Sequence, residues 1–298
     1  MIAFNFNIHF QDEPSLNDRV FDDTRQSFLV KEDKSSFEKE LFTIISDYVV
    51  LSDRRVKYYA SSNYSNDDNI LWGIEIEDVV FFSWNNNQQI LNYKKLLKYK
   101  VGLLEFWTLH TLLPIIFTIE KRFNILHVGS IDVEGIPIVI SAPSFGGKST
   151  LVDYFIKQGH ALISDDTIGI VKREDCVYAV PSYPYHRPFR SAETLGYKVD
   201  NWKDQLHPVK IIYKLNKDEA NCKITIEELK GIEKFKVFHF STFINFDYLK
   251  VNNFKLVSEM SKSIAVYSIT VPWTIRRISE VYEAITKHTK ILQSANML

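Results

Sequence analysis

The hydrophobic pattern of the first third of the chain is that of short strands separated by polar turns. Residues 4–10 alternate apolar and polar side chains as a half-buried strand does, residues 72–77 alternate again, and a further run follows at 79–84. Between them, the apolar spacing of residues 36–48 predicts a helix, and the asparagine and aspartate cluster at 63–69 predicts a loop. This pattern predicts a small α+β region over residues 1–90.

A long apolar stretch follows at residues 101–120. It contains Glu105 and His110, and ionisable side chains at such positions are costly in lipid. We therefore expect one or two helices within residues 88–121, packed on the domain that follows and kinked at Pro114, rather than a membrane span.

From residue 123 onward, strands and helices alternate as in an α/β domain. An apolar run at residues 136–140 precedes a turn, and the helix after it should bury one apolar face and end at Gly159 in the left-handed conformation. The buried face is predicted to consist of Leu151, Val152, Phe155 and Ile156. Later elements are predicted as strands at 209–215 and 222–226 and a closing helix at 278–292.

The turn between that strand and helix carries a phosphate-binding motif. It fits the pattern G-x-x-x-x-G-K-[ST], with alanine in place of the first glycine, over Ala142, Pro143, Ser144, Phe145, Gly146, Gly147, Lys148, Ser149 and Thr150. Glycines let the backbone turn its N–H groups toward an anion, Lys148 can contact phosphates, and Ser149 can ligate Mg²⁺. The motif lies between a strand and a helix, as its function requires, and predicts nucleotide binding by residues 144–150.

Two carboxylates, Asp165 and Asp166, follow at the end of the next short apolar strand. Beside a phosphate loop, carboxylates suit magnesium binding or proton abstraction from an attacking hydroxyl. If the backbone stays extended through the pair, the two side chains point to opposite faces and should have different roles. An isolated Asp-Asp pair more often marks a turn, but its place after the loop and one helix favours a functional pair.

His127 ends an apolar run that leads into the strand pair before the loop, which would bring it near the phosphates. A histidine there can pair with a carboxylate or contact phosphate oxygens, although a lone histidine after an apolar run is more often structural. Arginines stabilise charge in phosphoryl transfer, although each taken singly is more often a surface charge. The leading candidate is Arg187, followed by Arg190, Arg276 and Arg277.

Together, the histidine, the loop and the aspartate pair resemble the catalytic domain of the HPr kinase/phosphorylase family. The runs LHVGSIDVEGIPIVISAPSFGGKST and GHALISDD match the family's order of histidine, glycine-rich loop and GH-x-L-x-x-DD. The chain looks closer to related kinases encoded with ribosomally made peptides, such as lasso-peptide precursor kinases. Residues 181–187 and 195–196 resemble their P-x-Y-P-x-x-R and L-G run. The similarity covers residues 108–290, most strongly 123–170.

The resemblance implies a P-loop kinase domain of the HPr kinase C-terminal type, a mixed α/β sheet with flanking helices, that uses ATP and Mg²⁺. It also implies phosphate contact by Lys148, metal contact by Ser149, and base chemistry by one aspartate assisted by His127. We expect Asp166 to be the base and Asp165 the metal or histidine partner. The base would take a proton from a serine hydroxyl that attacks the γ-phosphate in line.

Two departures limit what the resemblance implies. Thr150 stands where the bifunctional enzymes usually carry glutamate, and their glycine-rich signature segment is missing further on. Both weigh against phosphorylase activity and against HPr as the substrate.

Composition agrees with such an enzyme. A chain of 298 residues can hold a catalytic domain and a smaller one, and its net charge of −1 argues against a general nucleic-acid binder. Two cysteines are too few for a disulfide framework, and the first residues lack the features of a signal peptide, so we expect a cytoplasmic protein. An oligomer is possible, and the sequence leaves that question open.

The predicted organisation is thus residues 1–90, a helical connector at 91–122 and a catalytic domain at 123–298. The domain would transfer the γ-phosphate of ATP to a serine of a ribosomal precursor peptide or small protein, and residues 1–90 would either recognise that substrate or serve as a packing extension. Two alternatives stay open: a kinase of a free hydroxylated molecule such as an amino acid, and a nucleotide-binding regulatory module without turnover. The intact histidine, lysine and aspartates favour an enzyme, because a pure binder needs no base.

Overall fold

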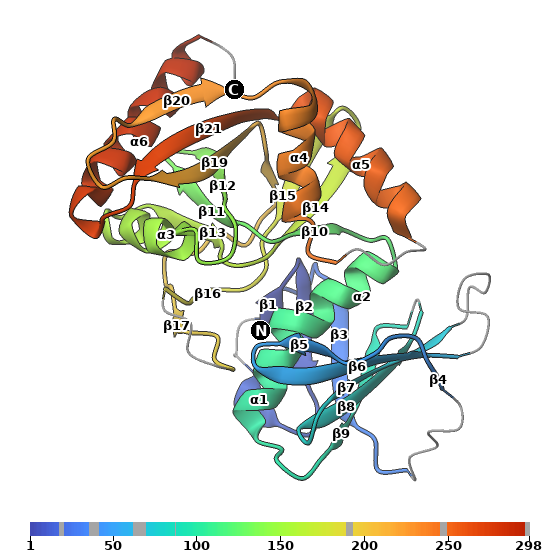
Figure 1. The fold of residues 1–298 in the computed structure, drawn as a ribbon. Coiled ribbons are helices and arrows are strands. Elements are labelled where there is room, and N and C mark those ends of the chain that lie inside the picture. The colour runs from blue at the N-terminus through green and yellow to red at the C-terminus, as the bar shows by residue number, and fades with distance from the viewer. Residues whose placement is uncertain are drawn as a thin grey trace. The chain divides into compact units, whose positions relative to one another are not determined.

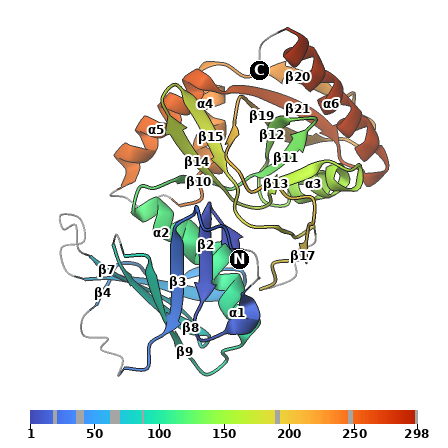
Figure 2. The ribbon, with the colours of Figure 1, turned by 180° about the vertical axis from the view of Figure 1, so that it is seen from behind.

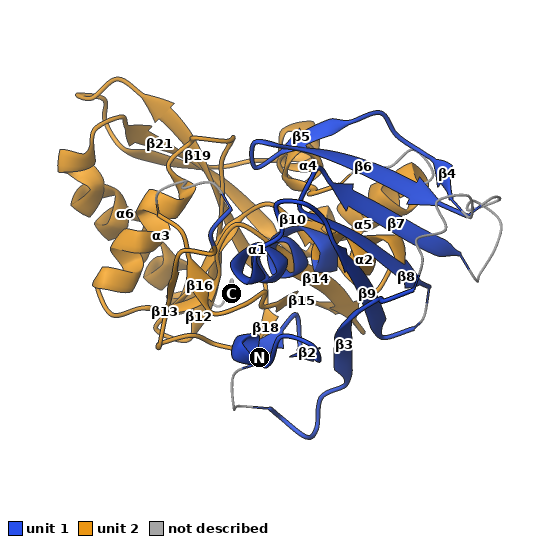
Figure 3. Cartoon of the chain, turned by 90° about the horizontal axis from the view of Figure 1, so that it is seen from below, with its two compact units in different colours: residues 1–113, 191–194 blue, residues 114–190, 195–298 orange. Residues whose placement is uncertain are grey.

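The computed structural model describes residues 1–17, 21–35, 42–61, 70–86, 88–188, 193–244 and 249–295. The chain forms two compact units, residues 1–113 with 191–194 and residues 114–190 with 195–298 (Figure 3). The division falls between Leu113 and Pro114, inside the stretch predicted as a helical connector.

The first unit is built on one nine-stranded sheet (Figure 1). Its strands are β1 (Ile2–Ala3), β2 (Phe6–Phe10), β3 (Ser27–Glu32), β4 (Thr43–Ile44), β5 (Val49–Leu51), β6 (Arg54–Ala60), β7 (Leu71–Ile76), β8 (Val80–Asn85) and β9 (Ile90–Lys95). The hydrogen-bonded order is β1-β2-β3-β9-β8-β7-β6-β4, with β5 paired to β6. A short 3-10 turn, η1 (Pro14–Leu16), follows β2.

The strands at the start of this unit agree with the sequence pattern in part. β7 and β8 confirm the two runs predicted within residues 72–84. The strand predicted over residues 4–10 is confirmed over β2 (Phe6–Phe10), whereas Phe4 and Asn5, with φ of 49° and 66°, form the turn of a hairpin between β1 and β2. A two-residue turn with both φ values positive matches the twist of the paired strands.

The helix predicted over residues 36–48 is wrong in its described part. Thr43 and Ile44 form β4 and pair with β6, because β-branched residues favour the extended backbone and the partner strand is available, although both side chains are exposed. Residues 36–41 and the loop predicted at 63–69 lie outside the described residues.

The predicted helical stretch at residues 88–121 starts later than expected. Leu91 and Tyr93 are buried on one face of β9 with polar Asn92 between them, which is the period of a strand. The helix itself is continuous over α1 (Val101–Phe106), η3 (Trp107–Leu112) and α2 (Leu113–Ile119). By length and composition it is apolar enough to cross a membrane, but 78% of its apolar window is buried, as in the core helix of a soluble protein.

Pro114 lies inside this helix without ending it. In a regular α-helix its ring would clash with the carbonyl of His110, four residues earlier. The turn directly before it, η3, is a π turn, and such widened turns are a known way to accommodate a proline. The irregularity predicted at Pro114 therefore takes the form of a wide turn on its N-terminal side.

The second unit combines three sheets with flanking helices. Its strands are β10 (Asn124–Leu126), β11 (Gly129–Val133), β12 (Ile136–Ser141), β13 (Ala161–Ser164), β14 (Ile168–Arg173), β15 (Cys176–Val180), β16 (Tyr185–His186), β17 (Tyr197–Lys198), β18 (His207–Pro208), β19 (Ile211–Asp218), β20 (Thr225–Glu228) and β21 (Ala265–Pro272). Its helices are α3 (Lys148–Lys157), α4 (Gly231–Ser241), α5 (Lys250–Ser263), η5 (Ile275–Arg277) and α6 (Ile278–Ser294). The sheets run β13-β11-β12-β19-β21-β20, β10-β14-β15-β18 and β16-β17.

The six-stranded sheet separates two hydrophobic cores. Ile138 and Ile140 of β12 join the core that includes α3 and α6, whereas Val139 between them joins the core that includes α4 and α5. Figures 1 and 2 show the two helix pairs on opposite sides of this sheet. β12, β19 and β21 run parallel, so their carboxyl ends meet at one edge, where ligands bind in open α/β sheets.

The mixed α/β architecture predicted for this part of the chain is confirmed. The helix after the loop buries Leu151, Val152 and Phe155, and Gly159 follows it with φ of 93°, as expected, whereas Ile156 of the predicted face is only half-buried. α6 confirms the closing helix, while β19 and β20 begin two and three residues later than the predicted strands, at Ile211 and Thr225.

Candidate active site

The phosphate loop joins the carboxyl end of β12 to the start of α3, as predicted from the sequence. Gly147 precedes the helix in the left-handed conformation, with φ of 86°. At Gly146 a β-carbon would lie 2.8 Å from both the Pro143 carbonyl oxygen and the Ala142 β-carbon, so this turn requires glycine. Phe145 has φ of 59° and is 76% exposed, so its bulk lies outside the loop.

The first residues of α3 face the same loop. Lys148 is buried, and its Nζ donates to the Ala142 carbonyl at 2.9 Å, which holds the ammonium across the loop. Ser149 Oγ donates to Asp165 Oδ1 at 3.3 Å. Ser144, which was predicted to contact the nucleotide, is exposed and does not line the cavity described below. The amides that open a ten-residue helix add the positive end of its dipole to this cluster.

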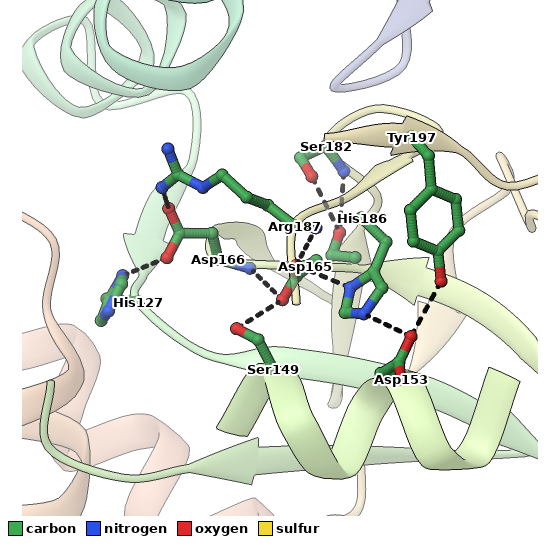
Figure 4. Close-up of polar contacts among 10 residues, drawn as sticks. His127, Ser149, Asp153, Asp165, Asp166, Ser182, His186, Arg187 and Tyr197 are labelled. Atoms are coloured by element: carbon green, nitrogen blue, oxygen red, sulfur yellow. Dashed lines mark hydrogen bonds and ion pairs between the residues drawn. The ribbon is translucent and has the colours of Figure 1, made fainter. Parts of the chain in front are cut away.

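Asp165 accepts four hydrogen bonds (Figure 4). Its Oδ1 accepts from the Ser149 hydroxyl and from the Asp166 N–H, the latter at 3.0 Å. Its Oδ2 accepts from His186 Nδ1 at 2.7 Å and from the Arg187 N–H at 2.9 Å. The carboxylate is 3% exposed, so these donors fix its orientation almost completely.

Asp166 takes a different path from the one predicted. Its φ of 67° is left-handed, and the Thr167 N–H donates to the Asp165 carbonyl at 2.8 Å, which closes a tight turn. The premise of an extended backbone through the pair is therefore wrong. Such a conformation costs a non-glycine residue on the order of 1 kcal/mol and persists only where its surroundings hold it.

Two cationic or potentially cationic side chains hold the Asp166 carboxylate. His127 Nδ1 lies 3.3 Å from Oδ1, and Arg187 Nη2 donates to Oδ2 at 3.1 Å. His127 itself stands between β10 and β11, with its N–H bonded to the Ser241 carbonyl at 2.6 Å. The two aspartates thus have different partners.

Three residues next to this pair, His186, Asp153 and Tyr197, were not predicted from the sequence. His186 is fully buried on β16, and its Nε2 lies 3.6 Å from Asp153 Oδ1 of α3. Tyr197 of β17 donates to the same oxygen at 3.0 Å. Partial desolvation, and then this hydrogen bond, raise the pKa of Tyr197 to about 12. The only sequence signal was the position of His186 directly before Arg187.

Of the remaining candidate arginines, the two that the structure describes, Arg276 and Arg277, do not join this cluster. Arg190 lies outside the described residues. Arg276 is exposed on η5, and Arg277 binds Glu280 through two hydrogen bonds of 2.9 and 2.7 Å. Arg277 also donates to the carbonyls of Ala220 and Cys222 and so connects the β19–β20 turn to α6.

One cavity brings most of the predicted residues together. It has a volume of about 490 Å³ and is lined by His127, Phe145, Gly146, Gly147, Lys148, Ser149, Thr150, Asp165, Asp166, Arg187, Pro188 and Trp273. The wall thus combines anion-binding backbone, an ammonium and a guanidinium with two carboxylates. Such a set can hold a phosphate chain and can accept a proton from a neighbouring hydroxyl.

The donor set also fits Mg²⁺. No three His, Cys, Asp or Glu side chains gather into a metal cage among the described residues. Mg²⁺ in phosphate-transfer sites takes only one or two protein oxygens besides phosphates and water. Ser149 Oγ and Asp165 Oδ1, 3.3 Å apart on the cavity wall, are oxygens of that kind.

Comparison with known proteins gives little direct information. No family model matches the chain, and no curated protein matches it. Among solved structures, the HPr(Ser) kinase/phosphatase from Coxiella burnetii aligns with 14% sequence identity and a TM-score of 0.36, covering 57% of this chain and 98% of the other. A likeness of that size carries no argument about fold or activity.

Proposed function

We propose that the chain is an ATP-dependent phosphotransferase that moves the γ-phosphate to a serine hydroxyl of a peptide or small protein. The observation that carries this proposal is the placement of Asp166, which contacts His127 and Arg187 on the wall of the cavity that the phosphate loop also lines. A module that only binds nucleotide has use for the loop and the metal ligands. Such a module does not need a second carboxylate, Asp166, that lies beside the loop and contacts a histidine and an arginine.

Each part of the cavity would contribute one effect. The loop N–H groups, the start of α3 and Lys148 would hold the phosphates of ATP. Mg²⁺, held by Ser149 and Asp165, would supply charge neutralisation on those phosphates. Each of these groups is already aligned by neighbours in the folded chain, so little reorganisation is needed at the moment of transfer.

Asp166 would perform the proton transfer. As the acceptor oxygen forms its bond to the γ-phosphorus, the hydroxyl proton would pass to Asp166, and the bond from phosphorus to the bridging oxygen of ADP would break. His127 would orient the carboxylate. Arg187 spans both aspartates, since its N–H bonds Asp165 and its guanidinium bonds Asp166, and it would stabilise charge on the transferring group.

The choice of a peptide serine as acceptor is supported by sequence resemblance alone. Residues 181–187 carry the run that resembles the peptide-modifying kinases, and the described part of that run supplies His186 and Arg187 to the cluster.

The test compares the wild type with Asp166→Asn and with Asp175→Asn. Asp175 is exposed in the turn between β14 and β15 and serves as the matched control. Each protein is incubated with MgATP and either serine-containing peptides or free amino acids, and ADP release and phosphorylated products are measured by mass spectrometry. We expect wild type and Asp175→Asn to phosphorylate a peptide serine equally. Asp166→Asn should be slower by about 10²–10⁴-fold and should bind ATP with similar affinity.

The alternatives give different results in the same experiment. Phosphate on a free amino acid but on no peptide would identify a small-molecule kinase. Tight ATP binding by all three proteins without phosphate transfer to any acceptor would contradict the enzyme proposal and favour a regulatory module.

A further inference from the structure

A second cavity adjoins the phosphate loop. It has a volume of about 330 Å³, and its walls are mainly apolar; the main contributors are Leu215, Val271, Trp273, Ile275, Ile278 and Val281. Gly146, Gly147, Thr150 and Trp273 line both this cavity and the larger one that holds Lys148 and the aspartates. The two cavities are therefore neighbours across the phosphate loop.

The fold places this second cavity at a ligand-binding edge. Leu215 lies on β19, and Val271 and Pro272 end β21, which runs parallel to β12 and β19. The phosphate loop leaves the same edge from β12. The floor of the cavity comes from η5 and α6 through Ile275 and Ile278. Crevices outside the carboxyl ends of parallel strands are the common ligand sites of open α/β sheets.

Trp273 stands between the two cavities. Its backbone is fixed by a hydrogen bond from its N–H to the Asp218 carbonyl at 3.0 Å, while its side chain is 50% exposed. A β-carbon on Gly147 would lie 3.4 Å from the indole ring, so the ring approaches the loop backbone closely. Lys217 Nζ lies 4.9 Å from the ring centroid and supports it from another side.

We propose that this cavity takes the base of a nucleoside triphosphate, which packs on the Trp273 indole while the phosphate chain occupies the neighbouring loop. The inference rests on the proposed function. A flat, largely apolar ring joined to a phosphate chain is the ligand that matches an apolar cavity with an aromatic wall next to an anion-binding loop. A cavity of this volume is also large enough for a purine and its ribose.

The proposal predicts that two parts of the ligand are bound by separable parts of the chain. Tripolyphosphate has the phosphates of ATP but no base, so it can use the loop and not the apolar cavity. Loss of the indole should weaken ATP binding by about tenfold, the size of one base–aromatic stack. It should leave tripolyphosphate binding unchanged.

Calorimetric titration of the whole chain with MgATP and with magnesium tripolyphosphate tests this. The variants are Trp273→Leu, which removes the ring, and Trp273→Phe, which keeps an aromatic face. The control is Phe254→Leu, which alters an exposed aromatic on α5. We expect Trp273→Leu alone to lose the preference for ATP over tripolyphosphate, Trp273→Phe to keep most of it, and the control to match the wild type.

Other outcomes overturn the inference, and they differ from failure of the proposed function. If the wild type binds ATP no more tightly than tripolyphosphate, or if Trp273→Leu weakens the binding of both ligands equally, the cavity does not hold the base. The proposal that the loop binds the phosphates is unaffected by either result. If the wild type binds neither ligand, both proposals fail. A circular dichroism spectrum of each variant confirms that any loss occurs in a folded protein.

Discussion

His186 Nδ1 lies 2.7 Å from Asp165 Oδ2, and both side chains are buried. The opposite ring nitrogen, Nε2, faces Asp153 Oδ1 at 3.6 Å and is buried without a hydrogen-bond partner. The histidine thus bridges the carboxylate on the cavity wall and a carboxylate of α3. Asp165 also accepts a hydrogen bond from Ser149 of α3. The aspartate turn is therefore connected to α3 twice, once through Ser149 and once through His186 and Asp153.

Replacing His186 should loosen Asp165 rather than remove a reacting group. In His186→Ala the Oδ2 atom keeps only the Arg187 N–H, so a buried acceptor loses its strongest partner, and the free energy of unfolding should fall by about 1–3 kcal/mol. If Asp165 helps to hold Mg²⁺, the variant should also need more Mg²⁺ for half-maximal transfer. Urea denaturation and the magnesium dependence of ADP release measure the two effects.

His186→Asn is the matched control for this prediction. The asparagine Nδ2 can donate from nearly the position of the histidine Nδ1, but it does not reach Asp153. We expect it to restore the magnesium dependence while recovering only part of the stability. A magnesium dependence identical in His186→Ala and the wild type would show that Asp165 is positioned without the histidine.

The phosphate loop offers a comparison between two glycines. At Gly146 an added methyl group meets backbone and side-chain atoms at 2.8 Å, whereas at Gly102 in α1 it meets nothing within 4 Å. Gly146→Ala should therefore displace the loop and weaken ATP binding by at least about tenfold, since the phosphates are held by backbone N–H groups. Gly102→Ala should leave ATP binding unchanged and raise the free energy of unfolding by about 0.5–1 kcal/mol. Equal ATP affinity in the two variants would show that the loop does not carry the phosphates.

The part of the site formed by residues close together in the sequence could be predicted from the sequence. The loop, the helix that starts at Lys148 and the aspartate pair lie within one strand–helix–strand unit, so their meeting follows from the connection rules of α/β folds. His127 was placed correctly for the same reason, since β11 and β12 are adjacent in sequence and paired in the sheet.

The rest of the site depends on chain paths that no local pattern encodes. His186 of β16 contacts Asp165 from a later segment of the chain, and Trp273 comes close to Gly147 because β21 lies in the same parallel set as β12. The wrong prediction of a helix at residues 43–44 has a related cause. Thr43 and Ile44 had a helical spacing but paired with β6, where tertiary contacts outweigh a weak local preference.

Acid should destabilise the second unit through a half-buried histidine, His207 of β18. Burial lowers the pKa of His207 below its ordinary value of 6.5, while nearby Asp132 and Asp204 oppose the shift and Lys203 adds to it. Its Nε2 is buried without a hydrogen-bond partner. The unfolded chain therefore takes up a proton at a higher pH than the folded chain, so the free energy of unfolding falls as the pH drops through 6.5 and toward the folded pKa.

Urea denaturation of the wild type, His207→Gln and His239→Gln at pH 8 and pH 5.5 measures this effect. His207→Gln carries no titrating ring, so its loss of stability between the two pH values should be smaller than that of the wild type. The improvement should be partial, because burial also lowers the pKa of His288 and acts in the same direction. His239 is exposed on α4, so His239→Gln is the matched control and should follow the wild type. An equal loss in His207→Gln and the wild type would show that this histidine is protonated alike in the folded and unfolded chains.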